Sequence, residues 1–218
     1  VAGDKVFDPV FLADFLHSFL EDPCDLQFVT GPVNDYPTAG RIIYLDEAPI
    51  GIIEVFDIAK HKVVNSLRVA LEKETLTLHQ VKNLIFQHMD QKKAMTAFGS
   101  MFAILEQEKR LTRRIFEQYT DSTSYELKLA GHLITEQQWD CATEANLSVY
   151  LLKAPPLFEA IETLQPDNAQ NEEYLTDIVE ILASRGANIR TRRVRNNRQV
   201  MAFNTSEELE FIRRNLAK

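Results

Sequence analysis

The stretch RQVMAFNTSEELEFI, residues 198–212, contains a change from strand to helix that is typical of α/β folds. Val200–Phe203 is a short apolar run that predicts a strand, and Thr205–Glu208 has the sequence of a helix capping box. Asn204 lies between them, at the carboxyl end of the predicted strand. An Asn before a helix is commonly a turn residue, but a carboxamide at a strand end can also hold a ligand.

Segments that alternate between strand and helix occupy both ends of the chain. Apolar runs predict strands at 26–30, 41–45, 50–56, 147–152, 189–194 and 200–203. Apolar residues at helical spacing predict helices at 8–21, 155–164, 174–184 and 205–216. Asp8 and Pro9 suit the start of the first helix, Asp46–Pro49 a hairpin turn, and Gly186 a helix end. The alternation indicates an α/β domain with a layered sheet that is mostly parallel or mixed.

Residues 58–140 interrupt this alternation with amphipathic helical patterns at 78–89, 95–105 and 111–119. They predict an all-helical insertion that divides the α/β domain into residues 1–57 and 141–218. The Met and Phe residues between 89 and 105 suit a helix-packing face, with a lid or a dimer surface as the sharper alternative. Trp139 suits a packing anchor, and a homo-oligomer formed through the insertion is a further expectation.

Composition narrows the classes of function. The 218 residues fit one α/β domain with an insertion, and 45% hydrophobic and 26% charged residues are typical of soluble globular proteins. A net charge of −8 argues against a general nucleic-acid or membrane-surface binder, because both need a positive face. No apolar run approaches the roughly 20 residues that span a bilayer. Cys24 and Cys141 lie far apart and predict reduced thiols in a cytoplasmic protein.

Two polar residues follow predicted strands and form a candidate metal site. Asp4 follows Val1–Gly3, which has the character of a strand end, and Asn204 follows Val200–Phe203. Carboxylate and carboxamide oxygens suit Mg²⁺, which typically takes one or two protein oxygens together with water and phosphate oxygens. If the two strands lie side by side, Asp4 and Asn204 can share one Mg²⁺. The plainer alternative is a cap and a turn residue.

Five segments of the chain occur in the order found in nucleotide-sugar pyrophosphorylases. They are VAGDKVFDPVFL, TAGRIIYLDEAPIGIIEVFD, EANLSVYLL, DNAQNEEYLTDIVEIL and AFNTSEELEFI. Over residues 1–57 and 142–216 the chain resembles the nucleotidyltransferase domain of N-acetylglucosamine-1-phosphate uridylyltransferase and its relatives. The resemblance implies a Rossmann-like domain and an Mg²⁺-dependent transfer of a nucleoside monophosphate from a nucleoside triphosphate to a sugar 1-phosphate, with release of pyrophosphate.

The resemblance also implies roles for individual residues. Asp4 and Asn204 would be the Mg²⁺ ligands, and Gly3 would let the backbone approach the nucleotide. The sugar-phosphate pocket would be lined by Gly40 through its backbone, by Glu54 as a hydroxyl acceptor, and by Asn146. No protein nucleophile is needed, because the metal and the hydrogen-bond donors position the reactants.

The chain departs from the family pattern at several places. The family's glycine-rich signature with its phosphate-binding Arg and Lys precedes the Gly-Asp pair, and we expect it upstream of Val1, so that this chain is the acceptor-binding part. Phe56 stands where relatives have Lys in Glu-x-Lys-Asp-Ala, and Leu147-Ser148 replaces Thr-Gly. These changes support an alternative, a non-catalytic module that binds a nucleotide-sugar or assembles partners.

Two further patterns have a plain structural explanation beside a functional one. SRGANIRTRRVRNNR, residues 184–198, holds six arginines and no acidic residue, which suits phosphate contact or a charged, solvated edge strand. The overall negative charge favours the edge-strand interpretation, and a nucleic-acid partner is the weaker hypothesis. His61, His79, His88 and His132 lie in or near the insertion without metal-ligand spacing, so ordinary surface or capping roles are expected.

Overall fold

The computed structural model describes residues 5–119, 127–203 and 205–216. The chain divides into two compact units. The sheet unit comprises Val1–Ile52, Asp140–Leu164 and Leu175–Lys218, and the helical unit comprises Ile53–Trp139 and Gln165–Tyr174. Gln165–Tyr174 therefore belongs with the helical unit although it lies far along the chain from the rest of that unit.

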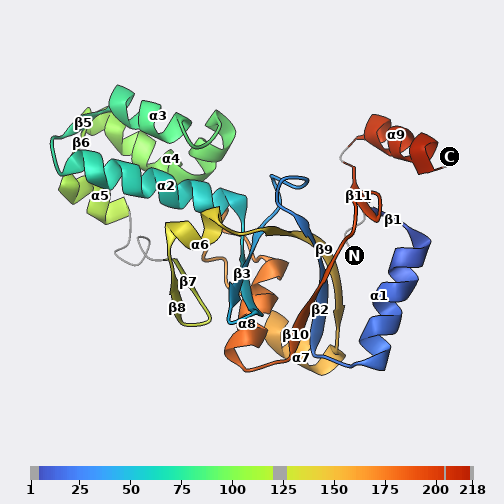
Figure 1. Cartoon of the computed structure of the whole chain (residues 1–218). Helices are drawn as coiled ribbons and strands as arrows, with labels where there is room; N and C mark the ends of the chain where they lie inside the picture. Colours follow the sequence, from blue (N-terminus) through green and yellow to red (C-terminus); the bar gives the residue numbers. More distant parts are fainter. Residues whose placement is uncertain (1–4, 120–126, 204, 217–218) are drawn as a thin grey trace. The chain divides into compact units, whose positions relative to one another are not determined.

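A five-stranded sheet with the order β10-β2-β9-β3-β4 organises the sheet unit (Figure 1). The strands are β2 (Leu26–Pro32), β3 (Arg41–Leu45), β4 (Ala48–Ile53), β9 (Glu144–Leu152) and β10 (Ile189–Arg193). β10 pairs with β2 in parallel, whereas β9 runs antiparallel to both β2 and β3. The sheet is therefore mixed rather than mostly parallel, because β9 returns antiparallel between its neighbours.

The β3–β4 hairpin is tighter than the sequence predicts. Asp46 and Glu47 have φ of 46° and 70°, which is the left-handed geometry of a two-residue type I′ turn. Pro49 consequently lies inside β4, the last strand of the sheet order, where an edge position tolerates its missing N–H. β4 ends at Ile53 rather than at Phe56, because helix α2 begins at Val55.

Helices cover both faces of this sheet. Because successive side chains of a strand point to opposite faces, Phe28 and Val29 of β2 enter different cores. Phe28 joins the core beneath α7 (Ala154–Ile161) and α8 (Ile178–Ser184), and Val29 joins Phe11 and Phe15 of α1 (Pro9–Glu21). In Figure 1, α1 lies on one side of the sheet and the α7–α8 pair on the other.

The predicted helix ends of the sheet unit are confirmed. Asp8 caps α1, since its Oδ1 accepts from the amides of Val10 (2.8 Å) and Phe11 (3.3 Å), with Pro9 in the first turn. Gly186 ends α8 with φ of 73°, and Ala187 N donates to Leu182 O (3.1 Å). The segment before α8 is a 3₁₀ turn, Leu175–Asp177, instead of a continuation of the helix to Tyr174.

A second ladder lies near both ends of the described chain. β1 (Lys5–Phe7) and β11 (Val200–Ala202) pair antiparallel, and α9 (Ser206–Leu216) follows. The predicted order of strand and then helix is confirmed, with a strand one residue shorter. The Glu208 side chain of the predicted capping box lies outside the described residues.

The helical unit is mainly rather than entirely helical. Its helices are α2 (Val55–Leu71), α3 (Leu78–Phe86), α4 (Gln91–Glu108), α5 (Arg113–Tyr119) and α6 (Glu136–Asp140). Two short ladders also occur, β5 (Leu76–Thr77) with β6 (Arg110–Leu111) and β7 (Leu127–Leu129) with β8 (His132–Ile134). These ladders are two or three residues long, too short for the sequence pattern to predict them.

Apolar packing holds the helical unit together. Phe98, Phe102 and Leu105 of α4 are buried in its core, which confirms the packing face, while Met95 on the same helix is 53% exposed. Trp139 is buried and its ring lies 4.9 Å from the ring of His61, in keeping with a packing anchor. Among the described residues, no helix combines the length and the apolar character needed to cross a membrane.

Candidate functional site

The structure describes some of the predicted site residues and not others. Gly3, Asp4 and Asn204 lie outside the described residues. Gly40 and Asn146 belong to the sheet unit, and Glu54 belongs to the helical unit. The surroundings of each group are therefore described within its own unit.

The chain neighbours of Asp4 and Asn204 lie side by side. Lys5 of β1 is opposite Ala202 of β11, and Phe7 is opposite Val200. The Asp8 amide continues the pairing by donating to Gln199 O (3.0 Å). The strand predicted before Asp4 lies outside the described residues, and the strand that the structure describes follows Asp4. β1 and β11 are adjacent antiparallel strands. The predicted strand Val1–Gly3 lies outside the described residues, so a Mg²⁺ shared by Asp4 and Asn204 stays a prediction.

Gly40 and Asn146 are brought together by a backbone hydrogen bond. The Asn146 amide donates to Gly40 O (2.9 Å), and on the other side Asn146 is opposite Thr30 of β2. The Asn146 side chain is buried, donates from Nδ2 to Tyr150 Oη (2.7 Å), and accepts at Oδ1 from the Ser148 amide (3.0 Å). The carboxamide is therefore held in a fixed orientation by its own strand.

The segment after Asn146 forms a bulge in β9. Between the pairs Phe28–Tyr150 and Thr30–Asn146, one residue of β2 faces three of β9. Ser148 in this bulge has φ of 56°, a left-handed conformation that non-glycine residues rarely adopt. Ser148 occupies the position where the family pattern has Gly, so the departure introduces local strain that the bond to Asn146 offsets.

Glu144, a partly buried carboxylate two residues before Asn146, links four strands of the sheet. Glu144 Oε2 accepts from Thr30 Oγ1 (2.5 Å) and from Tyr44 Oη (2.9 Å), and Glu144 Oε1 lies 3.5 Å from the Arg193 guanidinium. Tyr44 Oη is also 3.1 Å from Thr191 Oγ1. Burial raises the pKa of the Tyr44 hydroxyl above its ordinary value, so this group stays a hydrogen-bond donor.

In the helical unit, Glu54 precedes the first turn of α2. Its backbone oxygen accepts from the Ile58 amide (3.1 Å), and its side chain is partly buried. Asp57 in the same turn accepts from the Ala169 amide at 2.6 Å, and Ala169 is buried in the helical core. Burial raises the pKa of the Asp57 carboxyl, an effect that the Ala169 N–H and the charge of Lys60 partly oppose.

The loop that follows Asn168 is ordered by its own side chains. Asn168 Oδ1 accepts from the amides of Gln170 (3.1 Å) and Glu172 (3.3 Å), and Gln170 Nε2 donates to Tyr174 Oη (2.8 Å). Burial raises the pKa of Tyr174, and the charges of Asp57 and Glu54 add to the effect. The charges of both carboxylates therefore act on the Tyr174 hydroxyl of this loop.

Two of these features had no counterpart in the sequence prediction. Glu144 appears in the sequence only as an acidic residue at the start of an apolar strand, and Asp57 only as part of a family-like motif. Their partners Thr30 and Ala169 are 114 and 112 residues away. The sequence did contain one indication of both features. An acidic residue within an otherwise apolar segment needs a hydrogen-bond partner when the segment is buried.

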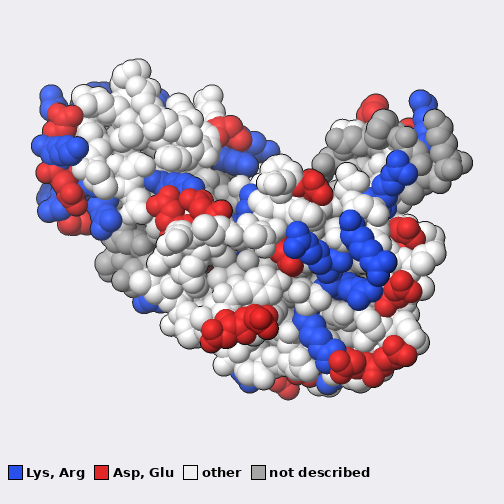
Figure 2. Space-filling model, in the orientation of Figure 1, with Lys and Arg blue, Asp and Glu red and all other residues white. Residues whose placement is uncertain are grey.

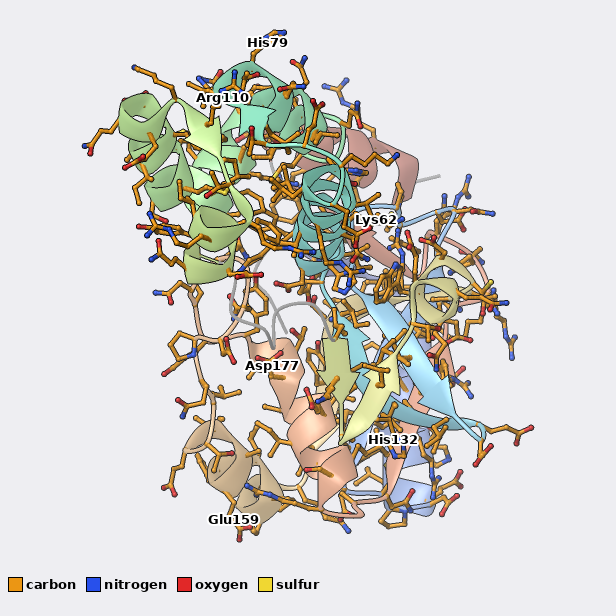
Figure 3. All side chains as sticks on the ribbon, turned by 90° about the vertical axis from the view of Figure 1, so that its left-hand side faces the viewer. Lys62, His79, Arg110, His132, Glu159 and Asp177 are labelled. Atoms are coloured by element: carbon orange, nitrogen blue, oxygen red, sulfur yellow. The ribbon has the colours of Figure 1, made fainter. Side chains whose placement is uncertain are left out.

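Two histidines of the helical unit, His79 on α3 and His132 on β8, lie apart from each other (Figure 3). Within the described ranges, no group of three or more His, Cys, Asp or Glu residues could hold a metal ion. Asp4 and Asn204 lie outside these ranges, so the metal site predicted for them stays a prediction.

The fold is that of an α/β protein whose mixed sheet carries polar side chains hydrogen-bonded around Glu144. No family model matches the chain. It is similar to the bifunctional protein GlmU of Pelotomaculum thermopropionicum, with 35% identity over 75 residues, 34% of this chain and 16% of the relative. The GlmU proteins of Clostridium botulinum (32% over 109 residues, 50% and 22%) and Bacillus subtilis (31% over 77 residues, 35% and 17%) are also similar.

The matched stretches cover only a small part of these relatives, between 16% and 22% of their length. Such partial similarity relates stretches of the chain to GlmU proteins. The activity, substrates and partners of the whole protein are therefore matters for proposal.

Proposed function

We propose that the chain is the acceptor-binding part of an Mg²⁺-dependent nucleotidyltransferase. The reaction joins a nucleoside monophosphate from a nucleoside triphosphate to a sugar 1-phosphate and releases pyrophosphate. The observation that carries the proposal is the pairing of Lys5 with Ala202, which makes chain neighbours of Asp4 and Asn204 adjacent. The contact between Gly40 and Asn146 and the partial similarity to GlmU proteins support it.

The domain organisation is part of the proposal. Residues 1–57 and 141–218 form a Rossmann-like nucleotidyltransferase domain, and residues 58–140 are a helical insertion within it. The location is cytoplasmic, in keeping with the free thiols of Cys24 and Cys141.

The donor set fits Mg²⁺. Asp4 and Asn204 supply one carboxylate and one carboxamide oxygen, which are hard ligands, and they leave room for water and phosphate oxygens. When bound, Mg²⁺ would neutralise charge on the phosphates. Gly3, which has no side chain, would let the backbone come close to the nucleotide.

The remaining residues orient the acceptor. Glu54 accepts hydrogen bonds from sugar hydroxyls, and Gly40 offers backbone groups. Asn146 Nδ2 has a second N–H beyond the one donated to Tyr150, so a held carboxamide can still donate to the sugar phosphate. Gly40 and Asn146, which are in contact within the sheet unit, would position the acceptor phosphate for attack on the α-phosphate of the nucleoside triphosphate, and such positioning is the main contribution of the protein to this chemistry.

The test is formation of a nucleotide-sugar by the full-length protein, supplied with nucleoside triphosphates, sugar 1-phosphates and Mg²⁺. Asp4→Ala and Asn204→Ala should each reduce turnover at least about a hundredfold, because the metal stabilises developing charge. Asp14→Ala removes an exposed carboxylate from α1 and is the matched control. Unchanged turnover in both site variants would refute the metal assignment.

A second candidate function is a non-catalytic module that binds a nucleotide-sugar or assembles partners. The favouring observation is Phe56, which is buried in the helical core where the family pattern has a basic residue. Calorimetry of the full-length protein with nucleotide-sugars, with and without Mg²⁺, separates the two candidates. Tight binding without turnover supports the module, and turnover supports the enzyme. Assembly through the helical insertion would appear as a homo-oligomer by light scattering.

A further inference from the structure

The free edge of the five-stranded sheet carries a cluster of arginines. β10 is the first strand of the sheet order, so one of its edges has no neighbouring strand within the described part of the sheet. The segment 185–198 contains Arg185, Arg190, Arg192, Arg193, Arg195 and Arg198 and no acidic residue. Figure 2 shows Lys and Arg side chains gathered on the side of the molecule where β10 lies. A local positive surface therefore exists on a chain with a net charge of −8.

Three of these arginines have partners in their own chain. Arg190 pairs with Asp22 (2.5 Å), Arg193 with Glu144 (3.5 Å) and Arg185 with Glu159 (3.8 Å). The other three are Arg192, Arg195 and Arg198. None of them has an acidic partner within ion-pair distance among the residues that the structure describes. Their positive charge is therefore available to an external anion.

The backbone of Arg192, Arg195 and Arg198 is held by strand pairing or by hydrogen bonds. Arg192 lies within β10, paired in register with Val29. Arg195 and Arg198 lie in the turn to β11, where their amides donate to Gln199 Oε1 (2.5 Å) and Asn196 Oδ1 (2.9 Å). The side-chain amides of this turn hold its backbone and leave the guanidinium groups outside. A ligand would thus meet a surface that needs little further ordering.

Protection of an exposed strand edge is the simpler explanation for charge at this place. Edge strands are commonly guarded by charged residues, Lys especially, that prevent pairing with another copy. Every basic residue between Arg185 and Arg198 is Arg, and none is Lys. A guard needs only charge, whereas the planar guanidinium matches phosphate with two parallel hydrogen bonds. The choice of Arg throughout favours recognition of phosphate.

We propose that Arg192, Arg195 and Arg198 bind a small polyphosphate anion, such as the phosphate chain of a nucleotide. Arg192 and Arg195 are three residues apart, at most about 11 Å of extended chain, which suits several linked phosphates better than one. A long nucleic acid would extend beyond the cluster onto acidic surface, and surface charges act within about 8 Å at physiological salt. None of the residues proposed for the active site takes part, so the site is additional to that one.

The experiment is calorimetry of the full-length protein with inorganic tripolyphosphate and with ATP, in EDTA to exclude metal-dependent binding. The patch variant is Arg192→Gln/Arg195→Gln/Arg198→Gln. The control variant, Arg110→Gln/Arg113→Gln/Arg114→Gln, changes the net charge equally at exposed arginines of the helical unit, which are not part of the cluster. Melting temperatures establish that both variants are folded. A duplex oligonucleotide serves as the long polyanion.

The patch variant should weaken tripolyphosphate and ATP binding alike, by about thirtyfold or more, because charge-assisted contacts are lost. The control variant should lose less than about threefold, the effect of net charge alone at moderate salt. Equal losses in the two variants, absence of binding at millimolar tripolyphosphate, or tighter binding of the duplex than of tripolyphosphate would overturn the proposal. None of these outcomes depends on whether the chain belongs to an active transferase.

Discussion

The two units hold their predicted site residues by different means. In the sheet unit, hydrogen bonds fix the Asn146 side chain in a bulged strand. Two residues earlier, the Glu144 carboxylate accepts hydrogen bonds from Thr30 and Tyr44, and we call these three side chains the Glu144 hub. In the helical unit, Glu54 and Asp57 lie at the start of a helix that apolar packing holds in place. Hydrogen bonds fix the orientation of a side chain, whereas apolar packing fixes the position of a helix. We therefore expect substitutions in the two units to change the free energy of unfolding for different reasons.

The largest effect is expected in the core of the helical unit. Phe98→Ala should lower the free energy of unfolding by about 3–5 kcal/mol, because it leaves a cavity among buried side chains. Met95→Ala, on the exposed side of the same helix, should change it by less than about 0.5 kcal/mol. Urea denaturation followed by circular dichroism measures both. Similar losses for the two variants would mean that packing does not hold this unit.

Glu144 gives the corresponding test in the sheet unit. Glu144→Ala should destabilise the protein by about 2–3 kcal/mol, because the hydroxyls of buried Thr30 and partly buried Tyr44 lose their acceptor. Glu144→Gln retains an acceptor and should have a smaller effect. Glu159→Ala removes an exposed carboxylate and is the control. If alanine and glutamine at position 144 are equivalent in urea denaturation, the hub is not held by hydrogen bonds.

The Asp57 carboxyl is both hydrogen-bonded and largely buried, and the pH dependence of stability distinguishes the two effects. Asp57→Ala should cost about 1–3 kcal/mol because the Ala169 amide loses its acceptor, whereas Asp57→Asn keeps one. Burial raises the pKa of Asp57 in the folded state above 3.8, so the folded state favours the protonated carboxyl. The contribution of this group to stability is therefore present at low pH and is lost as pH rises through the raised pKa.

Denaturation of the native protein and of Asp57→Asn across this pH range tests the sign. The stability of the native protein relative to the Asn variant should fall as pH rises above 3.8 and then level off. A relative stability that increases with pH would show that hydrogen bonding to the carboxylate outweighs its burial.

The smallest effect is expected at the bulge. Ser148→Gly should stabilise the protein by about 0.5–1 kcal/mol, because glycine relieves the left-handed strain at φ of 56° and loses part of the gain to backbone entropy. Thermal denaturation measures this difference. Ser184→Gly, in the last turn of α8, is the opposite control and should destabilise. A destabilising effect of Ser148→Gly would contradict the strain assigned to the bulge.

Local features of the fold were predictable from the sequence. The Asp8 cap, the Gly186 helix end and the buried stripe of α4 depend on residues close together in the chain, and the structure confirms them. The antiparallel direction of β9 and the bulge at Ser148 depend on pairing between distant segments. No local pattern encodes such pairing, so the sequence left a mixed and a mostly parallel sheet both open.

The candidate site divides in the same way. Gly40 and Asn146 were named from a family-like pattern, and the structure brings them into contact. Glu144 and Asp57 were missed because their partners lie more than 100 residues away in the chain. A carboxylate that is partly buried needs a hydrogen-bond donor or a cation, but the neighbouring sequence does not identify that partner.

The most direct test of the central claim is a double-mutant cycle for divalent-cation binding by the full-length protein. Mn²⁺ serves as a paramagnetic substitute for Mg²⁺, and its binding is measured by electron paramagnetic resonance for the native protein, Asp4→Ala, Asn204→Ala and the double variant. Two ligands of one ion should be strongly coupled, so the double variant should bind scarcely more weakly than the weaker single variant. Additive losses, or native affinity in both single variants, would contradict a shared ion.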